Sequence, residues 1–338
     1  MSFLKICLIP GDGVGNEVIP AAAEVLSALN LYIQFTEAKA GFGHFQKSGN
    51  AIPDETLAAI ESAGVALFGA TSSPSTKVEG YRSPILAMRK AFDLYANLRP
   101  VQSLPGNFSR PNLDLLIVRE NTEGLYAGRE RMEDADTAIA ERVITRKGSS
   151  RIARIAYEHA NQKSAIKNQK SIVTIVHKAN VLKLTDGLFR EECLKVAKEF
   201  PHITTKEMLV DAMSMRLVKD PENFDVIVTT NLFGDILSDE ASALIGGLGV
   251  APSANIGAKV AVFEPVHGSA PDIMGQGIAN PIGAILSSAM MLDHLKQGDT
   301  ASRVRRAVNE TLKTGVLPKD LGGKATTKEV TKAVISIL

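Results

Sequence analysis

Two acidic side chains four residues apart, Asp235 and Asp239, are the part of this sequence best suited to do chemistry. On an α-helix, positions i and i+4 share one face, so both carboxylates would point the same way. Like charges held together need a compensating cation, and hard ions such as Mg²⁺ or Mn²⁺ prefer oxygen ligands. An isolated pair at this spacing is more often a plain helix surface. The spacing therefore predicts a metal site only if the rest of the chain supports it.

Three arginines suit a substrate that carries several carboxylates. Arg89 projects from an otherwise apolar helical segment, and Arg99 and Arg119 each end a run that reads as buried. A guanidinium group binds a carboxylate through two parallel hydrogen bonds, so converging arginines would fix a polycarboxylate in one orientation. Any one of them alone could equally be a structural ion pair.

A lysine, a third acid and a tyrosine complete this set. Lys178 ends a predicted strand, where a neighbouring cation and desolvation can lower a lysine pKa enough for it to accept a proton. Asp211 stands in an apolar stretch, where a carboxylate is costly unless it is paired or bound to metal. Together with Tyr126, these residues predict metal-assisted chemistry on a polycarboxylate.

Two glycine-containing segments invite a nucleotide interpretation. The opening run Ile9-Pro-Gly-Asp-Gly-Val-Gly-Asn-Glu17 is not a dinucleotide-binding fingerprint, because Asn16 stands where the third glycine is required. We interpret it as a tight turn between a strand and a helix. The run Glu264-Pro-Val-His-Gly-Ser-Ala-Pro-Asp-Ile273, which continues to Asn280, has the glycine, serine and polar residues of a cradle for a small ligand such as an adenosine.

Composition excludes several classes of protein. The net charge of +1 gives no reason to expect nucleic acid, and no apolar run reaches the roughly 20 residues that span a bilayer. The two cysteines, Cys7 and Cys193, predict a reducing compartment without disulfides. A strand starts almost at the first residue, so we expect no targeting peptide and a cytoplasmic location.

Short apolar runs alternate with helical periodicity, which predicts an α/β architecture. The expected strands are 4–9, 65–69, 113–119, 171–177 and 226–230. The expected helices are 17–28, 54–62, 85–96, 149–161, 185–199, 235–245 and 281–295. Composition reveals no domain boundary, and the glycine cluster at 246–249 could be a hinge or a crossover.

Over its full length the chain resembles the metal-dependent β-decarboxylating dehydrogenases that act on isocitrate, 3-isopropylmalate, homoisocitrate and tartrate. The resemblance is carried by the opening run, by Gly-Asp-Ile-Leu-Ser-Asp at 234–239, by the 264–273 run and by Leu-Gly-Gly-Lys-Ala-Thr-Thr at 321–327. It implies a two-domain isocitrate/isopropylmalate dehydrogenase-like fold on a shared twisted mixed sheet, not a Rossmann fold. The first domain would be 1–98 plus 247–338, on the NAD side. The second, 99–246, would hold metal, substrate and a dimerisation arm near 120–145.

The resemblance also implies partners and roles. The working form would be a homodimer with shared active sites, with pairing into tetramers left open. Asp235 and Asp239 would bind Mg²⁺ or Mn²⁺ with Asp211 borrowed from the partner subunit, which also lends Lys178. The implied substrate-binding residues are Ser72, Ser73, Arg89, Arg99, Arg119, Tyr126, Lys178 and Asn180. The implied NAD-binding residues are Asn180, Glu264, His267, Gly268, Ser269, Ala270, Asp272, Ile273 and Asn280.

The implied reaction is oxidation of a 2-hydroxy-3-carboxy acid followed by loss of CO₂. Metal would lower the pKa of the hydroxyl group, Lys178 would accept its proton as hydride passes to NAD, and Tyr126 would return a proton to carbon. Asp272 would accept hydrogen bonds from the ribose and repel a 2′-phosphate, which favours NAD over NADP.

Two stretches bear on the substrate. Arg-Glu-Asn-Thr-Glu-Gly at 119–124 resembles the isocitrate and homoisocitrate branches, and the segment 71–86 resembles homoisocitrate dehydrogenases, with Ser72, Ser73 and Arg82 available to a distal carboxylate. Ile85 and Leu86 instead resemble the apolar wall of 3-isopropylmalate enzymes. We predict homoisocitrate, converted to 2-oxoadipate in lysine biosynthesis through α-aminoadipate. 3-Isopropylmalate, isocitrate and broad specificity remain as alternatives. A non-catalytic regulatory subunit is disfavoured because every catalytic position is present.

Overall fold

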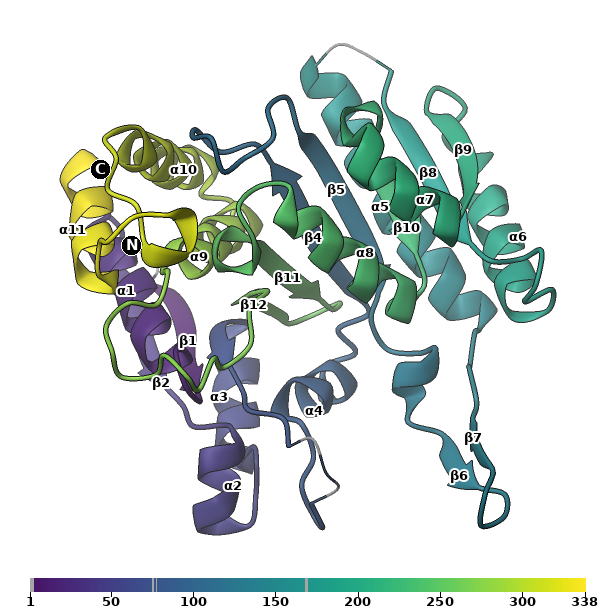
Figure 1. Cartoon of the computed structure of the whole chain (residues 1–338), viewed down its shortest axis with the longest axis horizontal. Coiled ribbons are helices and arrows are strands. Elements are labelled where there is room, and N and C mark those ends of the chain that lie inside the picture. Colours follow the sequence, from purple (N-terminus) through teal and green to yellow (C-terminus); the bar gives the residue numbers. More distant parts are fainter. Residues whose placement is uncertain (1–2, 75, 77, 168–169) are drawn as a thin grey trace. The chain divides into compact units, whose positions relative to one another are not determined.

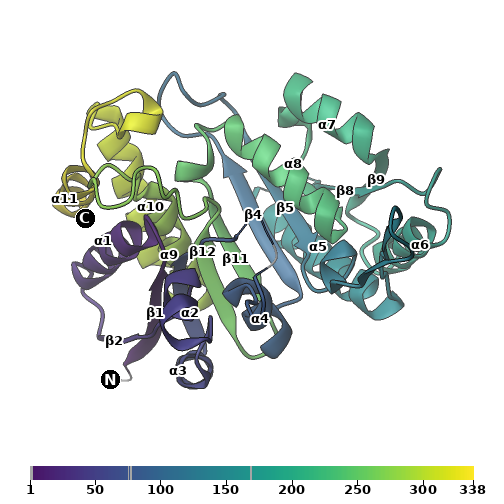
Figure 2. The same ribbon diagram turned by 60° about the horizontal axis from the view of Figure 1, so that its bottom comes forward.

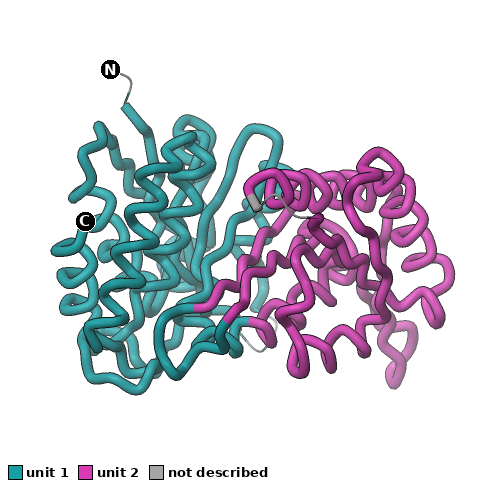
Figure 3. Tube along the Cα trace, turned by 90° about the horizontal axis from the view of Figure 1, so that it is seen from above, with its two compact units in different colours: residues 1–94, 104–111, 242–338 teal, residues 95–103, 112–241 magenta. Residues whose placement is uncertain are grey.

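The computed structural model describes residues 3–74, 76, 78–167 and 170–338, so positions 75 and 77 of the predicted substrate loop lie outside it. The chain forms two compact units, drawn in separate colours in Figure 3. Unit 1 contains residues 1–94, 104–111 and 242–338, and unit 2 contains residues 95–103 and 112–241. The predicted boundaries at 98/99 and 246/247 lie within a few residues of these, and the structure also assigns 104–111 to unit 1.

Unit 1 is built on five strands in the order β2-β1-β3-β12-β11. Their bounds are Ile33–Glu37 (β2), Leu4–Gly11 (β1), Val65–Ala70 (β3), Ala261–Pro265 (β12) and Pro252–Ile256 (β11). Neighbours are parallel except for β11 and β12, which are antiparallel. Every residue of β3 is buried, as expected of a parallel strand covered on both faces.

The helices of unit 1 cover both faces of these strands (Figure 1). Their bounds are Gly15–Ser27 (α1), Phe42–Ser48 (α2), Asp54–Ala63 (α3), Pro84–Ala91 (α4), Ile282–His294 (α9), Gly298–Lys313 (α10) and Thr327–Ile337 (α11). Phe68 of β3 packs with Ile60 of α3, whereas a side chain at the next position, Gly69, would meet Ile19 of α1. Because successive strand residues point to opposite faces, α3 and α1 lie on opposite sides of β3.

Unit 2 has the strand order β4-β5-β10-β8-β9. The bounds are Ala96–Gln102 (β4), Asp114–Glu120 (β5), Val226–Thr229 (β10), Ile172–His177 (β8) and Thr204–Leu209 (β9). Only β4 and β5 run antiparallel, so the strands of unit 2, like those of unit 1, are partly parallel and partly antiparallel. A separate hairpin of β6 (Glu130–Met132) and β7 (Ala138–Ala140) projects from the unit and is almost entirely exposed (Figure 1).

The helices of unit 2 are α5 (Arg146–Lys167), α6 (Thr185–Ala197), α7 (Val210–Lys219) and α8 (Asn231–Ala243). Helices α5 and α6 pack against each other, and α7 begins directly after β9 (Figure 2). The predicted helix around the acidic pair is confirmed, because Asp235 and Asp239 both lie on α8.

All five predicted strands and all seven predicted helices have counterparts, but one helix was predicted too long. The helix expected at 85–96 ends at Ala91. Asp93 has a φ of 45°, a left-handed conformation that a helix cannot continue through, and β4 starts at Ala96. The elements that were not predicted are strands β2, β4, β6, β7, β9, β11 and β12 and helices α2, α7, α10 and α11.

Two further features of the described chain bear on the class of protein. The described part contains no helix with the length and apolar character needed to cross a membrane. Cys7 and Cys193 are free, buried thiols, and burial raises the pKa of Cys7 to about 11. A thiol in that state is largely unreactive at neutral pH.

Candidate functional site

Helix α8 presents the acidic pair predicted to hold metal. Asp235 and Asp239 are partly exposed, with 31% and 51% of their side chains accessible, so both carboxylates can reach a ligand. Burial raises the pKa of Asp239, an effect that Arg99 opposes and the nearby Asp235 reinforces. The two like charges are therefore close enough to interact, as the four-residue spacing predicts.

Arg99 is held beside both acids. It lies on β4 with only 9% of its side chain exposed, and its Nη1 is 2.8 Å from Asp239 Oδ1 while its Nη2 is 3.4 Å from Asp235 Oδ1. Two other side chains fix the guanidinium group: Asn97 accepts from Nε at 2.8 Å, and Ser238 accepts from Nη1 at 2.7 Å. This anchoring leaves the arginine little freedom to turn away from α8.

Arg119 approaches the same helix from β5 and is 1% exposed. Its Nη1 contacts Asp235, and Asn231 Oδ1 accepts from Nε at 3.1 Å and from Nη2 at 2.8 Å. Gly234 makes this approach possible, because a side-chain carbon there would lie 2.6 Å from Arg119 Cγ. The glycine of the 234–239 motif thus leaves room for the arginine stem.

Tyr126 completes this cluster. It lies in the short 3₁₀ helix Leu125–Ala127, its hydroxyl group donates to Asp235 Oδ2, and the Arg119 guanidinium carbon lies 5.2 Å from its ring centre. Burial raises the pKa of Tyr126, and the hydrogen bond to Asp235 adds to the effect. The phenol is therefore protonated at neutral pH and can serve as a proton donor.

Lys178 and Asp211 form a second cluster in unit 2. Lys178 is the first residue after β8, as predicted, and its Nζ lies 2.5 Å from Asp211 Oδ1. The expectation that Asp211 sits in an apolar setting is wrong, because 65% of its side chain is exposed at the start of α7. Its hydrogen bond with Lys178 lowers the pKa of Asp211. The nearby Asn180, predicted to meet substrate and NAD, is exposed.

A buried ion pair between Asp186 and Arg142 fixes the backbone of Lys178. Its N–H donates to Asp186 Oδ2 at 2.6 Å, and Asp186 is fully buried against Arg142, whose Nη1 lies 2.7 Å from Oδ1. Arg142 also donates to the Thr230 hydroxyl group at 2.8 Å. The lysine backbone is therefore hydrogen-bonded to one member of a buried ion pair. Neither Asp186 nor Arg142 was predicted from the sequence.

The predicted metal ligands do not all meet within this chain. Among the described residues, no three acidic, histidine or cysteine side chains gather as a metal site would require. Asp235 and Asp239 share one cluster, whereas Asp211 pairs with Lys178. The two α8 carboxylates nevertheless fit a hard divalent ion, because both are oxygen donors on one helix face with exposed edges.

Unit 1 contains the segment predicted to bind nucleotide, directly after β12. Burial lowers the pKa of His267, and its buried Nε2 has no hydrogen-bond partner in the described part of the chain. A buried ring nitrogen without a partner is uncommon, and a ligand with a complementary polar edge would satisfy it. Asp272 is exposed, as a carboxylate that receives ribose hydroxyl groups needs to be.

Other predicted nucleotide residues already have protein partners. Asn280 Nδ2 donates to Asp320 at 3.0 Å, and its Oδ1 accepts from the Ile282 N–H at 3.0 Å. Glu264 Oε1 accepts from Asn255 at 2.8 Å. Gly268 and Ile273 lie in the same loop, in which Ala270 has a φ of 40°.

The remaining predicted substrate residues also lie in unit 1. Arg89 is 7% exposed on α4, where it donates to Asn255 Oδ1 at 3.2 Å and lies 3.7 Å from Glu264. Ser72 donates to the Ser269 hydroxyl group at 3.0 Å, and Ser73 is exposed.

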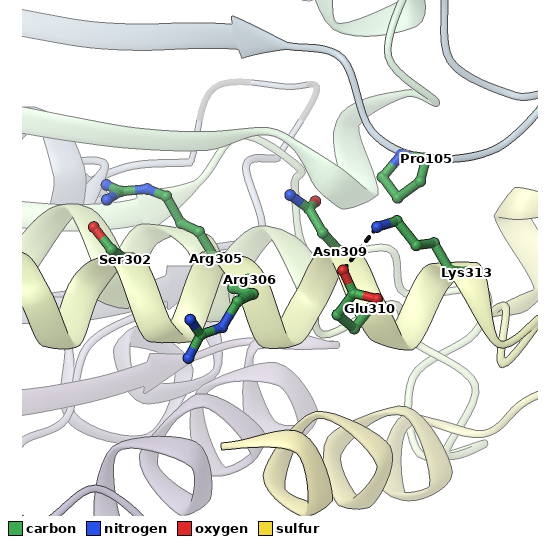
Figure 4. A pocket seen from close by; sticks show the side chains of 7 residues that line it. All are labelled: Pro105, Ser302, Arg305, Arg306, Asn309, Glu310 and Lys313. Carbon is green, nitrogen blue, oxygen red and sulfur yellow. Dashed lines mark hydrogen bonds and ion pairs between the residues drawn. The ribbon is translucent and has the colours of Figure 1, made fainter.

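A cavity of about 410 Å³ opens elsewhere on unit 1, along α10 (Figure 4). Its lining consists of Pro105, Ser302, Arg305, Arg306, Asn309, Glu310 and Lys313. None of the residues predicted to be functional lines it. Lys313 and Glu310 form an ion pair at 2.7 Å across one end.

Comparison with known proteins identifies this arrangement. The family model described as isocitrate/isopropylmalate dehydrogenase matches residues 5–334. The chain belongs to this family.

Relatives within the isocitrate/isopropylmalate dehydrogenase family carry different substrate names. The chain is 53% identical over 334 residues to isocitrate/homoisocitrate dehydrogenase of Thermus thermophilus, covering 99% of this chain and 98% of the relative. It is 50% identical over 331 residues to 3-isopropylmalate dehydrogenase of Methanothermobacter thermautotrophicus, covering 98% and 97%. The crystal structure of isocitrate dehydrogenase from Methylococcus capsulatus superposes with a TM-score of 0.93 at 44% identity, covering 98% of both chains.

Family membership and this superposition confirm the predicted fold class and the resemblance. The chain is accordingly an oxidoreductase that oxidises and decarboxylates hydroxy acids. Its family generally uses a nicotinamide dinucleotide and a divalent metal ion.

Sequence reasoning missed the residues that hold the predicted ones in place. Asn97, Asn231 and Ser238 are fully buried polar residues that bind the two arginines. A signal for Asn231 was present, because it follows a buried strand and lies four residues before Asp235 of the acidic motif. Asn97 offered no such signal, since it lay just beyond the end of a helix that was predicted too long.

Proposed function

We propose that this chain is an NAD-dependent, divalent-metal-dependent dehydrogenase that converts homoisocitrate to 2-oxoadipate and CO₂. The observation that carries the proposal is the convergence of Arg99, Arg119 and Tyr126 on the two α8 carboxylates. Acids for a metal, cations for substrate carboxylates and a protonated phenol are the groups that oxidative decarboxylation of a polycarboxylate requires.

Two features favour homoisocitrate over the alternatives. The 119–124 run matches the isocitrate and homoisocitrate branches, and Ser72 and Ser73 offer hydroxyl groups to a third carboxylate. The name of the Thermus relative includes homoisocitrate together with isocitrate. The specific candidate against it is 3-isopropylmalate: Leu86 on α4 is 40% exposed and could contact an isopropyl group. The name of the Methanothermobacter relative favours that alternative.

The chain's own residues would divide the work as follows. Asp235 and Asp239 would hold Mg²⁺ or Mn²⁺, which when bound lowers the pKa of the substrate hydroxyl group and stabilises negative charge on its oxygen. Arg89, Arg99 and Arg119 would bind the carboxylates and fix the substrate's orientation. Tyr126 would give its proton to the carbon atom that loses CO₂.

Asp211 and Lys178 would serve the other half of a homodimer. Because Lys178 pairs with Asp211 and not with the α8 acids, the two would act together at the site of the partner subunit. There this chain's Lys178 would accept the hydroxyl proton, and the partner subunit's Lys178 would do the same at this chain's own site. The exposed β6–β7 hairpin lies in the predicted dimerisation arm and leaves its backbone edges available to a second copy.

NAD would bind in the 264–280 segment. Asp272 would accept hydrogen bonds from the ribose hydroxyl groups and exclude a 2′-phosphate by charge repulsion. The unpartnered Nε2 of His267 would meet a polar edge of the adenine. Gly268 and Ser269 would allow the backbone to approach the nucleotide closely.

The test is kcat/KM for homoisocitrate, isocitrate and 3-isopropylmalate, measured in parallel with NAD and Mg²⁺ and repeated with NADP. A higher kcat/KM for homoisocitrate supports the proposal. A higher kcat/KM for 3-isopropylmalate would indicate that Ile85 and Leu86 determine which substrate is accepted. Absence of NAD reduction with all three substrates by the purified homo-oligomer would refute it.

A further inference from the structure

Asp12 connects three backbone segments of unit 1. It lies in the turn between β1 and α1, where its own N–H donates to the Ala70 carbonyl at 2.7 Å. Its carboxylate accepts from Phe42 N–H at 2.7 Å and from Gly43 and Ser72 N–H groups, each at 2.9 Å. Hydrogen bonds to an ionised acceptor are the strong ones, so this carboxylate fixes all three segments relative to one another.

The start of α2 is shaped to receive this carboxylate. A side-chain carbon at Gly41 would lie 2.5 Å from Asp12 Oδ1, and one at Gly43 would lie 3.1 Å away. Gly41 also has a φ of 127°, which side-chain-bearing residues rarely adopt. The two glycines therefore let Asp12 approach the first N–H groups of α2, which have no partner within the helix.

Tyr81 holds Ser72 from its other side. Its hydroxyl group donates to the Ser72 carbonyl at 2.8 Å, and its ring packs edge-on against Phe42 at 5.1 Å and Phe45 at 5.2 Å between ring centres. The N–H group of Ser72 is thus bound by Asp12 and its carbonyl group by Tyr81, and both of these residues contact α2.

The turn between β1 and α1, which contains Asp12, also contacts the predicted nucleotide-binding segment at Ser269. Val14 N–H donates to the Ser269 carbonyl at 2.9 Å, and the Ser72 hydroxyl group donates to that of Ser269 at 3.0 Å. A side-chain carbon at Gly13 would lie 1.9 Å from the Ser269 carbonyl oxygen, so the turn and the segment are in close contact. Ser72 therefore links a predicted substrate-binding position to a predicted nucleotide-binding position.

We propose that Asp12 and Tyr81 are positioning residues that set substrate choice by holding Ser72 and Ser73 in one place. The inference rests on the proposed function, in which these two serines receive the third substituent of the substrate. A hydroxyl group selects a distal carboxylate over an alkyl group only when its backbone is fixed, because recognition geometry tolerates shifts of only about 0.5 Å. Neither Asp12 nor Tyr81 needs to touch the substrate for this effect.

The test uses Tyr81→Phe, which removes one hydroxyl group and keeps the ring packing, together with Asp12→Asn. Tyr32→Phe is the matched control, since Tyr32 is 59% exposed. Loss of one hydrogen bond should raise the KM for a substrate with a distal carboxylate about 2- to 10-fold, with kcat within about twofold. The ratio of kcat/KM for that substrate to kcat/KM for 3-isopropylmalate should fall by the same factor.

Hydrogen exchange of the folded homo-oligomer supplies a readout that does not depend on activity. Peptides covering 71–83 should exchange faster in Tyr81→Phe than in wild type or Tyr32→Phe, while peptides of unit 2 keep their rates. Unchanged exchange at 71–83, or an equal loss of kcat/KM on every accepted substrate, would overturn the proposal even if Asp12→Asn fails to fold. A wild-type chain without dehydrogenase activity would remove the proposed function, whereas the exchange data would still report on the two anchors.

Discussion

Gly234→Ala tests the close packing of helix α8 against the side chain of Arg119, because it adds a carbon atom at that contact. The added carbon would lie 2.6 Å from Arg119 Cγ and 2.7 Å from Arg119 Cβ. Carbon atoms in good contact are about 3.5–4.0 Å apart, so an overlap of about 1 Å must be relieved. Arg119 is 1% exposed, and its guanidinium group is held by Asn231 and Asp235, so neither end of the side chain can move freely.

The magnitude follows from two opposing effects on stability and one effect on catalysis. Overpacking a filled site costs about 1–3 kcal/mol, and replacing a helix glycine by alanine returns about 1 kcal/mol. For a chain of 338 residues, the net loss of about 1 kcal/mol should lower Tm by roughly 1–2 °C. A displacement of about 1 Å at a positioning group costs about 100-fold in rate, which is the fall we expect in kcat/KM.

The assay compares Gly234→Ala with Gly187→Ala, measuring Tm and kcat/KM for the preferred substrate. Gly187 also lies in a helix, α6, but a side-chain carbon there would meet nothing within 4 Å. Gly187→Ala should therefore raise Tm slightly and leave kcat/KM within about twofold. If Gly234→Ala behaved like Gly187→Ala in both measurements, the reasoning about Arg119 would be refuted.

Four other changes test single groups. Asp239→Asn should raise the Mg²⁺ concentration for half-maximal activity about 10-fold or more, and a chelator should abolish wild-type activity, as metal titrations will show. Tyr126→Phe should lower kcat about 100-fold with little change in substrate KM, because it removes a proton donor; an unchanged kcat would rule out that role. Asp272→Ala should raise the KM for NAD about 10-fold and improve the NADP/NAD ratio of kcat/KM, and an unaltered ratio would contradict the ribose assignment. Burial lowers the pKa of His267, so below pH ~6.5 the unfolded chain takes up a proton that the folded chain resists, and stability should fall with pH. His267→Gln should flatten the decline of Tm between pH ~7.5 and pH ~5.5, and an identical slope would show that His267 does not contribute.

The positions of the groups proposed to do the chemistry could be predicted from the sequence because their signal is local. The four-residue spacing of Asp235 and Asp239 placed them on one helix face, and Lys178 was correctly placed at the end of a strand. These inferences need only the helical or strand repeat and the neighbouring residue types.

The supports of the site could not be predicted, because they depend on contacts between distant segments. Asn97 is a buried polar residue on β4, a strand whose start was hidden by the left-handed turn at Asp93. Asp12 meets residues 30 and 60 positions away, and no periodic pattern encodes such pairs. The exposed setting of Asp211 was missed for the same reason, since its partner Lys178 is 33 residues distant.

The division of the chain between the two units has a consequence for its synthesis on the ribosome. Residues 95–103 and 112–241 emerge before β12 is translated, so unit 2 has all its strands while unit 1 still lacks two. Strand β3 pairs with β12 along one edge, and α1 packs against α11 near the C-terminus. Until those segments are made, the nascent N-terminal portion carries an unpaired, apolar strand edge of the kind that aggregates.

A molecular chaperone would therefore bind a defined segment, residues 1–94, until residues 242–338 of the same chain have been made. Chaperone binding should increase when translation stalls between codons 94 and 261. These limits follow from the order in which the two units are encoded along the chain and not from the catalytic groups.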